Sequence, residues 1–242
     1  MQISGQTVHP FLSFRIPSIQ NTGRLRRSYI FVFQLLSQLD RPQMKPNETP
    51  FSTAAPPKDV PYPPDGSFNW LRSTATHDEW AIGDRAGSNL PSQLKALTAS
   101  AEANGLTLPS IFTRFMADPI LHKHLRSASG DYLRLADSVL PFANGYLIRF
   151  LSDQQECAHW YLFVNSTGSD HCVVSSYEYF DADEMDYELD ELKETDFQFW
   201  TESFELFFCR YWIEHEVMFS QNDETPLPNI DPQILMLYTN SG

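Results

Sequence analysis

The side chains best suited to metal binding gather in one part of the sequence. They are Cys157, His159, His171 and Cys172. Thiolates and imidazoles are the usual ligands of tetrahedral zinc. If Val164 lies opposite Ser169 in a hairpin, the alternation of side chains along a strand places His159 and His171 on opposite faces. A one-residue change of register would bring the two rings together, but no clustered third and fourth ligand is present. We therefore expect half-buried histidines and small apolar cysteines here, and no metal site.

Other candidate catalytic residues carry weaker signals. Cys157 and His159 would fall on one face of a strand, as a Cys–His catalytic pair requires, but the sequence shows no third group to orient the ring. His122 and His124 stand two positions apart, so a helix would point them in different directions. The chain contains no G-x-S-x-G nucleophile motif. We predict no catalytic residue and no cofactor.

Carboxylates are concentrated between residues 181 and 196. The first part resembles a calcium loop, but it lacks the glycine at the sixth position and the closing glutamate. A run of this kind is usually a solvated surface, although charge of one sign can also steer a basic partner protein to its binding face. Both interpretations stay open. The candidate partner-binding face consists of Asp181, Asp183, Glu184, Asp186, Glu188, Asp190 and Glu191.

The overall charge limits the possible functions. The chain has 242 residues and a formal net charge of -14, with 42% apolar and 20% charged residues. An acidic chain is poorly suited to general nucleic-acid binding, because phosphate contacts need a basic surface. No Gly-x-Gly occurs among the 10 glycines, which argues against loops that wrap nucleotides. We expect a soluble protein that binds another protein, and neither nucleic acid nor membrane.

Charge and proline content divide the chain into four parts. Residues 1–43 are poor in acids and are interpreted as a disordered extension, an organelle-targeting segment or a start codon placed too early. The expected location is cytoplasmic unless that segment is a transit peptide. Residues 44–88 are predicted to be a Pro-rich linker and irregular lead-in. The folded domain is expected over 89–222, followed by a tail over 223–242.

The predicted domain starts with helices and continues with strands. Pro91 is expected to open a helix that ends at Asn104-Gly105, and Pro109 to open a second one. Asp118-Pro119 would end that helix and start a third turn. Strands are predicted over 131–136, 145–151, 160–164 and 172–174. Because no helix separates these strands, the sheet should be mainly antiparallel.

A long helix is predicted over roughly residues 201–220. Its aromatic side chains recur at three- and four-residue spacing, which indicates an apolar face that covers the sheet. Glu202 and Glu205 in its first turn suit the positive end of the helix dipole. The aromatic residues are Phe204, Phe207, Phe208, Tyr211 and Trp212.

Several stretches, taken in order, resemble the SUKH superfamily, the Smi/Knr-like proteins. The likeness covers about residues 89–220 and is closest to uncharacterised stand-alone members. The stretches are Leu108-Pro109-x-x-Phe112-x-x-Phe115-Met116, residues 145–151, Cys157-x-x-Trp160-Tyr-Leu-Phe163 with Cys172-Val-Val174, and Ser203-Phe-Glu-x-Phe207-x-x-Arg210-Tyr-Trp-Ile-Glu-x-Glu216.

The resemblance implies an α+β fold with N-terminal helices, a mainly antiparallel sheet and a C-terminal helix packed on it. It also implies a non-catalytic module that binds a partner protein, either as a toxin-immunity protein or as a regulatory adaptor. The N-terminal extension and Pro-rich linker depart from a compact immunity protein. The alternative hypothesis is a small hydrolase with its site in the groove between sheet and helix.

Overall fold

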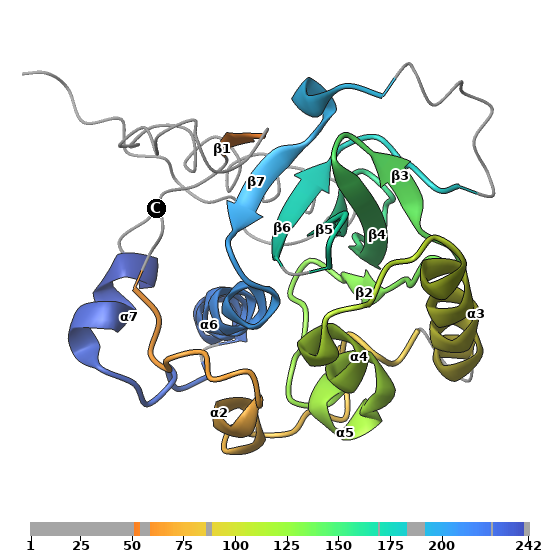
Figure 1. Ribbon diagram of the computed structural model, residues 1–242. Coiled ribbons are helices and arrows are strands. Elements are labelled where there is room, and N and C mark those ends of the chain that lie inside the picture. The colour runs from red at the N-terminus through yellow and green to blue at the C-terminus, as the bar shows by residue number, and fades with distance from the viewer. Residues whose placement is uncertain are drawn as a thin grey trace, which may run out of the picture.

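The protein has an α+β fold in which helices cover one face of a sheet (Figure 1). This confirms the fold class expected from the sequence. The coordinates come from a computed structural model, which describes residues 51–53, 59–85, 89–168, 170–182, 192–223 and 225–239.

The sheet has seven strands in the order β1-β7-β6-β5-β4-β2, and β3 also pairs with β4. Every pairing is antiparallel except that of β1 with β7, so the mainly antiparallel sheet is confirmed. Strands β1, β3 and β7 lie outside the predicted set, and β2 is shorter than the predicted strand. The strands are β1 (Ser52–Thr53), β2 (Tyr132–Leu133), β3 (Leu140–Phe142), β4 (Gly145–Ser152), β5 (His159–Asn165), β6 (His171–Ser176) and β7 (Gln198–Thr201).

The helices follow the proline signals in the sequence. Pro91 stands in the first turn of α3, Pro109 caps α4, and Asp118 accepts a hydrogen bond from the Ile120 amide where α5 begins. The tail adds a short helix that packs on α6. The helices are α2 (Asn69–Arg72), α3 (Leu90–Ala103), α4 (Ser110–Ala117), α5 (Pro119–His122), α6 (Phe204–Asp223) and α7 (Pro232–Thr239), with a 3-10 turn at Glu194–Asp196.

The hairpin between β5 and β6 forms in a register different from the predicted one. Val164 lies opposite His171, not opposite Ser169. The connecting turn is therefore longer than predicted, and it includes Gly168 in the left-handed conformation with φ +70°. Because the shift is an even number of residues, His159 and His171 still lie on opposite faces, as expected.

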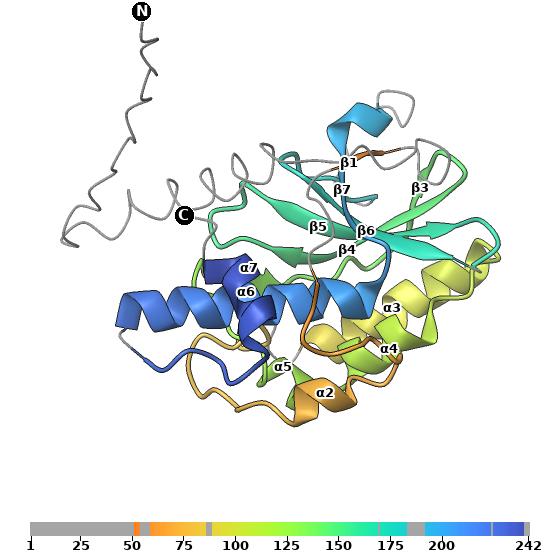
Figure 2. The same ribbon diagram turned by 90° about the vertical axis from the view of Figure 1, so that its left-hand side faces the viewer.

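Helix α6 lies across one face of the sheet with α3 and α4 beside it (Figure 2). Its aromatic side chains pack in the main core, which confirms the predicted role of this helix. The ring of Phe208 stacks on Phe115 of α4 at 4.2 Å between centroids, and its edge meets Phe150 of β4 at 5.9 Å. Aromatic rings from the helices and from the sheet thus pack together in one core.

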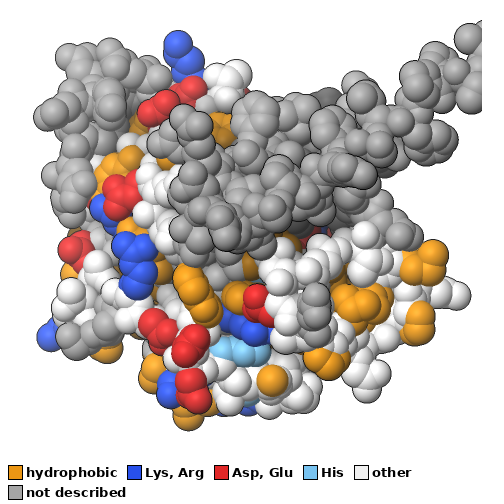
Figure 3. All heavy atoms as spheres, turned by 180° about the vertical axis from the view of Figure 1, so that it is seen from behind, with side chains coloured by type: hydrophobic (Ala, Val, Ile, Leu, Met, Phe, Trp, Pro, Cys, Tyr) orange, Lys and Arg blue, Asp and Glu red, His pale blue; other side chains and the backbone are white. Residues whose placement is uncertain are grey.

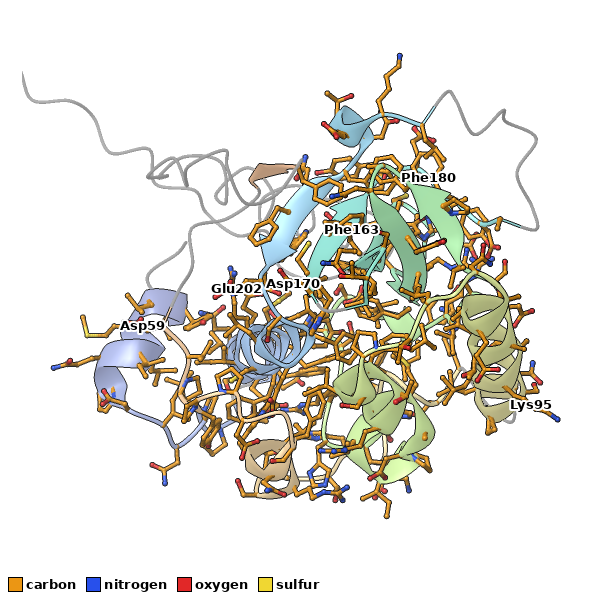
Figure 4. The ribbon with its side chains drawn as sticks, viewed as in Figure 1. Asp59, Lys95, Phe163, Asp170, Phe180 and Glu202 are labelled. Carbon is orange, nitrogen blue, oxygen red and sulfur yellow. The ribbon has the colours of Figure 1, made fainter. Side chains whose placement is uncertain are left out.

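A second hydrophobic cluster lies on the opposite face of the sheet. Phe163 and Phe180, both labelled in Figure 4, belong to it together with Phe51 and Phe197. The Phe51 ring meets the edge of Phe163 at 5.1 Å. The described part of the sheet therefore buries apolar side chains on both faces.

The segment before α3 belongs to the fold and is not only a linker. Phe68, Leu71 and Ile82 are fully buried in the main core. The predicted domain boundary at residue 89 therefore falls too late. The proline-rich lead-in has no periodic pattern in the sequence, yet residues 59–85 supply apolar side chains to the main core.

Candidate functional site

Of the seven residues of the predicted acidic face, the structure describes only Asp181. Asp181 is 7% exposed, so the prediction that it lies on a solvated surface is wrong. It forms an ion pair with Arg149 at 2.8 Å, which explains why burial is tolerated. The other predicted face residues lie outside the described part of the chain: Asp183, Glu184, Asp186, Glu188, Asp190 and Glu191.

Arg149 is the centre of a polar cluster on the sheet face opposite α6. Its guanidinium carbon lies 4.2 Å above the centroid of the Tyr179 ring, a cation–π contact. The Tyr179 hydroxyl donates a hydrogen bond to Asp181 at 3.3 Å. Arg134 also lies over this ring, at 4.8 Å, and it pairs with Glu156. Each cation in the cluster thus has its own carboxylate.

His159 completes this cluster as a neutral group. Its Nδ1 atom and the Ser152 hydroxyl are 2.9 Å apart, and its ring meets the edge of Tyr179 at 5.2 Å. Burial, with the neighbouring charges of Arg149 and Arg134, lowers the pKa of His159 to about 4. A neutral buried ring is the structural histidine that the sequence predicted.

Four of the candidate metal ligands and nucleophiles, His122, His124, Cys157 and His159, form other contacts. Among the described residues, no group of three or more His, Cys, Asp or Glu side chains could hold a metal ion. His122 bonds to the Phe115 carbonyl at 2.8 Å, and His124 to the Thr74 carbonyl at 3.1 Å. The Cys157 thiol donates to the Gln155 carbonyl at 3.5 Å, whereas His159 binds Ser152.

The buried thiols are poor nucleophiles. All three cysteines are free. Burial raises the pKa of Cys172 and of Cys209 to about 12 in each case, so both stay protonated at neutral pH. Cys157 is the exposed one of the three.

A second polar cluster, which sequence reasoning missed, joins the segment before β2 to α6. Asp131 Oδ2 accepts hydrogen bonds from the hydroxyls of Ser127, Ser129 and Tyr211, each at 2.9 Å. His215 Nε2 lies 3.5 Å from the same oxygen. The only signal in the sequence was the presence of Ser, Asp and His, and most chains of this size contain those residue types.

This cluster has the residue types of a catalytic triad but not its connections. In a triad the histidine stands between serine and aspartate and accepts the serine proton. Here the Ser127 hydroxyl bonds directly to Asp131, and His215 Nδ1 accepts the Ala128 amide at 3.0 Å. The histidine therefore does not activate the serine. The groove between α6 and the sheet, where the hydrolase hypothesis places its site, holds Phe150 and Phe204 rings 5.1 Å apart.

Only some of the charged side chains of residues 150–224 are exposed at the surface. This segment contains 19 acids and two bases, Lys193 and Arg210. Arg210 is 4% exposed and donates to the Trp200 carbonyl at 3.2 Å, so its charge lies inside the fold. Acids at the surface include Asp170 and Glu202, which both lie at the end of the sheet where α6 begins (Figure 4). Figure 3 shows that, on the described part of the rear surface, acidic and basic side chains are interspersed.

Comparisons with protein-family models, curated proteins and solved structures found no match. The resemblance to the SUKH superfamily therefore stays a prediction from the sequence. In the described residues no helix is both long and apolar enough to cross a membrane.

Proposed function

We propose that this protein is a non-catalytic interaction module that binds a partner protein through the acidic surface of residues 150–224. The partner carries a basic binding face. Its role is that of a toxin-immunity protein or a regulatory adaptor, as the resemblance to Smi/Knr-like proteins implies.

One observation carries this proposal, namely the large excess of acids over bases in that segment. Of its two bases, Arg210 is buried, and Lys193 remains exposed. Its acids outnumber its bases 19 to two, and those that are buried, such as Asp181 and Glu205, have partners inside the fold. A surface with charge of one sign attracts a partner of the opposite sign and speeds their encounter.

The interior supports the same function. The buried histidines, thiols and carboxylates described above form hydrogen bonds and ion pairs mainly with other segments of the same chain, and these contacts stabilise the fold. A binding module needs such groups only for stability, whereas an enzyme needs at least one aimed at a substrate.

The test uses two variants with the same change in net charge. The first reverses Asp183, Glu184, Asp186 and Glu188 to lysine. The matched control reverses four exposed acids outside the segment. Those four are Asp78, Glu79, Asp84 and Glu102.

Proteins captured by the wild-type chain from its native lysate are identified and purified, and their dissociation constants are measured at low and moderate salt. The first variant should bind the basic partner about tenfold more weakly, with a flatter salt dependence. The control variant should bind as the wild type does. Equal losses of affinity in both variants would show that net charge alone causes the effect and would contradict a specific binding face. Unchanged binding in the first variant would refute the proposal.

A further inference from the structure

Two buried aspartates occupy opposed positions just beyond the end of the β2–β4 ladder. Tyr132 pairs with Ser152 in this antiparallel ladder, so the next opposed positions are Asp131 and Asp153. Directly opposed residues have Cβ atoms about 4.5–5.5 Å apart and side chains on the same face. Asp131 is 5% exposed and Asp153 is 0% exposed.

Each of these carboxylates has one oxygen with partners and one without. Asp131 Oδ2 accepts the three hydroxyl hydrogens described above, and Oδ1 has no partner. Asp153 Oδ1 accepts the amides of Cys157 at 2.5 Å and Ala158 at 3.2 Å, and Oδ2 has no partner. An acceptor buried without a donor costs free energy, so two of them opposite each other need an explanation.

No described cation neutralises the two groups. His215 of α6 faces Asp131, but its Nδ1 accepts the Ala128 amide, so the ring hydrogen is on Nε2. Burial lowers the pKa of His215 to about 4, which leaves the ring neutral at pH 7 despite Glu214 and Glu216 nearby.

The other groups around the two carboxylates are also uncharged or already paired. Tyr211 of α6 donates its hydroxyl hydrogen to Asp131. Arg134 pairs with Glu156 in the turn after β4. Like charges buried directly opposite each other would therefore repel without compensation.

We propose that Asp131 and Asp153 share one proton between their unpartnered oxygens at neutral pH. One hydrogen then serves both orphan acceptors, since the protonated oxygen donates and the other accepts. The shared proton links the segment 127–131 to the β4–β5 turn and makes this corner of the fold sensitive to alkaline pH. This inference does not depend on the proposed function.

Electrostatics agree with that geometry. Burial raises the pKa of Asp131, although hydroxyl hydrogen bonds oppose the shift. Burial also raises the pKa of Asp153, and the charge of Asp131 raises it further. Two coupled carboxylates of this kind titrate as a pair, so the shared proton belongs to neither residue alone.

The direction of the pH effect follows from proton binding. Above the ordinary aspartate pKa the unfolded chain has lost both protons, while the native pair keeps one. Stability therefore falls as pH rises, and the unfolding equilibrium constant increases up to about tenfold per pH unit until the shared proton is lost. His159 and His215, whose pKa values are lowered to about 4, and the Cys172 and Cys209 thiols, whose pKa values are raised to about 12, also change stability near and above pH 7, but they do so equally in the wild type and in the aspartate variants.

The decisive variant is Asp153→Asn. Its amide oxygen can keep the bonds from Cys157 and Ala158, and its amide hydrogen can donate permanently to Asp131 Oδ1. Infrared spectra at pH 7 should show the C=O band of a protonated carboxyl group in the wild type. Both Asp153→Asn and Asp131→Asn should lack this band. The exposed Asp137→Asn variant is the matched control and should keep the band.

Stability provides an independent readout. The urea concentration at the unfolding midpoint should fall more steeply between pH 7 and 9 in the wild type and in Asp137→Asn than in Asp153→Asn, because only Asp153→Asn lacks the shared proton. If the wild-type spectrum at pH 7 has no protonated carboxyl band, or if the band survives in both aspartate variants, the two residues do not share a proton. A wild-type spectrum without the band refutes the proposal even if a variant fails to fold.

Discussion

The carboxylate of Glu205 joins the lead-in segment to α6. It is 2% exposed and accepts the backbone amides of Gly66 at 2.6 Å and Phe68 at 2.9 Å, together with the Trp70 indole N–H at 3.0 Å. Phe68 has a left-handed backbone with φ 57°, which is unfavourable for a bulky residue. The hydrogen bonds to Glu205 therefore help to hold a strained turn.

Replacement of Glu205 by alanine should destabilise the protein strongly. The change leaves three buried donors without an acceptor, and a hydrogen bond to a charged group contributes about 1.5–3 kcal/mol. We expect a loss of about 3 kcal/mol or more in the free energy of unfolding, measured by urea titration. The neighbouring exposed Glu202→Ala should change it by less than about 0.5 kcal/mol. Similar effects of both variants would contradict the assigned role.

Among the elements, the β4–β5 ladder depends on close approach of the two backbones. Gly145 opens β4 opposite Asn165, and a Cβ atom there would stand 2.2 Å from the Val164 carbonyl oxygen. No side chain can be accommodated at that distance without a shift of the ladder. The glycine is thus required by contact across the strands and not by its own torsion angles.

Gly145→Ala should therefore be more harmful than Gly105→Ala. Gly105 has φ +69° and nothing within 4 Å of a Cβ position, so alanine there costs only the left-handed backbone, about 1 kcal/mol. At Gly145 the clash should cost about 3 kcal/mol. Thermal or urea unfolding of the two variants provides the comparison, and a smaller loss at Gly145 would contradict the observed strand spacing.

For the whole molecule, the described fold begins well before its first long helix. The main core includes Phe68, Leu71 and Ile82 from the lead-in and Tyr238 from α7. The Tyr238 hydroxyl also donates to the Asp59 carbonyl at 3.1 Å, so the start of segment 59–85 touches α7. The lead-in and the tail therefore both contact α6.

A chain that starts at residue 89 should lose cooperative folding. It lacks three fully buried large side chains, each of which contributes about 1.5–3 kcal/mol, and typical domains have only about 5–15 kcal/mol of stability. A chain that starts at residue 51 retains these side chains. Calorimetry should show a single transition for the longer chain and none for the shorter, and a sharp transition in the shorter chain would place the boundary at residue 89 after all.

Local patterns in the sequence determined most of the elements. Pro91, Pro109 and Pro119 mark helix starts because proline lacks the amide hydrogen that the first turn does not use. The aromatic spacing of α6 follows from 3.6 residues per turn, and the hairpin follows from alternation around a polar turn. The α+β class and the aromatic helix on the sheet depend only on such short-range rules.

Only the tertiary structure decided which charged groups are surface groups and which are internal. Glu205 has the sequence position of an ordinary helix N-terminal acid, but its partners lie more than 130 residues away. Asp181 begins an acidic run, yet Arg149 holds it inside. Strand register puts Asp131 and Asp153 at opposed positions. A carboxylate is stable in the interior only with donors or a proton beside it, and those partners come from distant segments that no local pattern can identify.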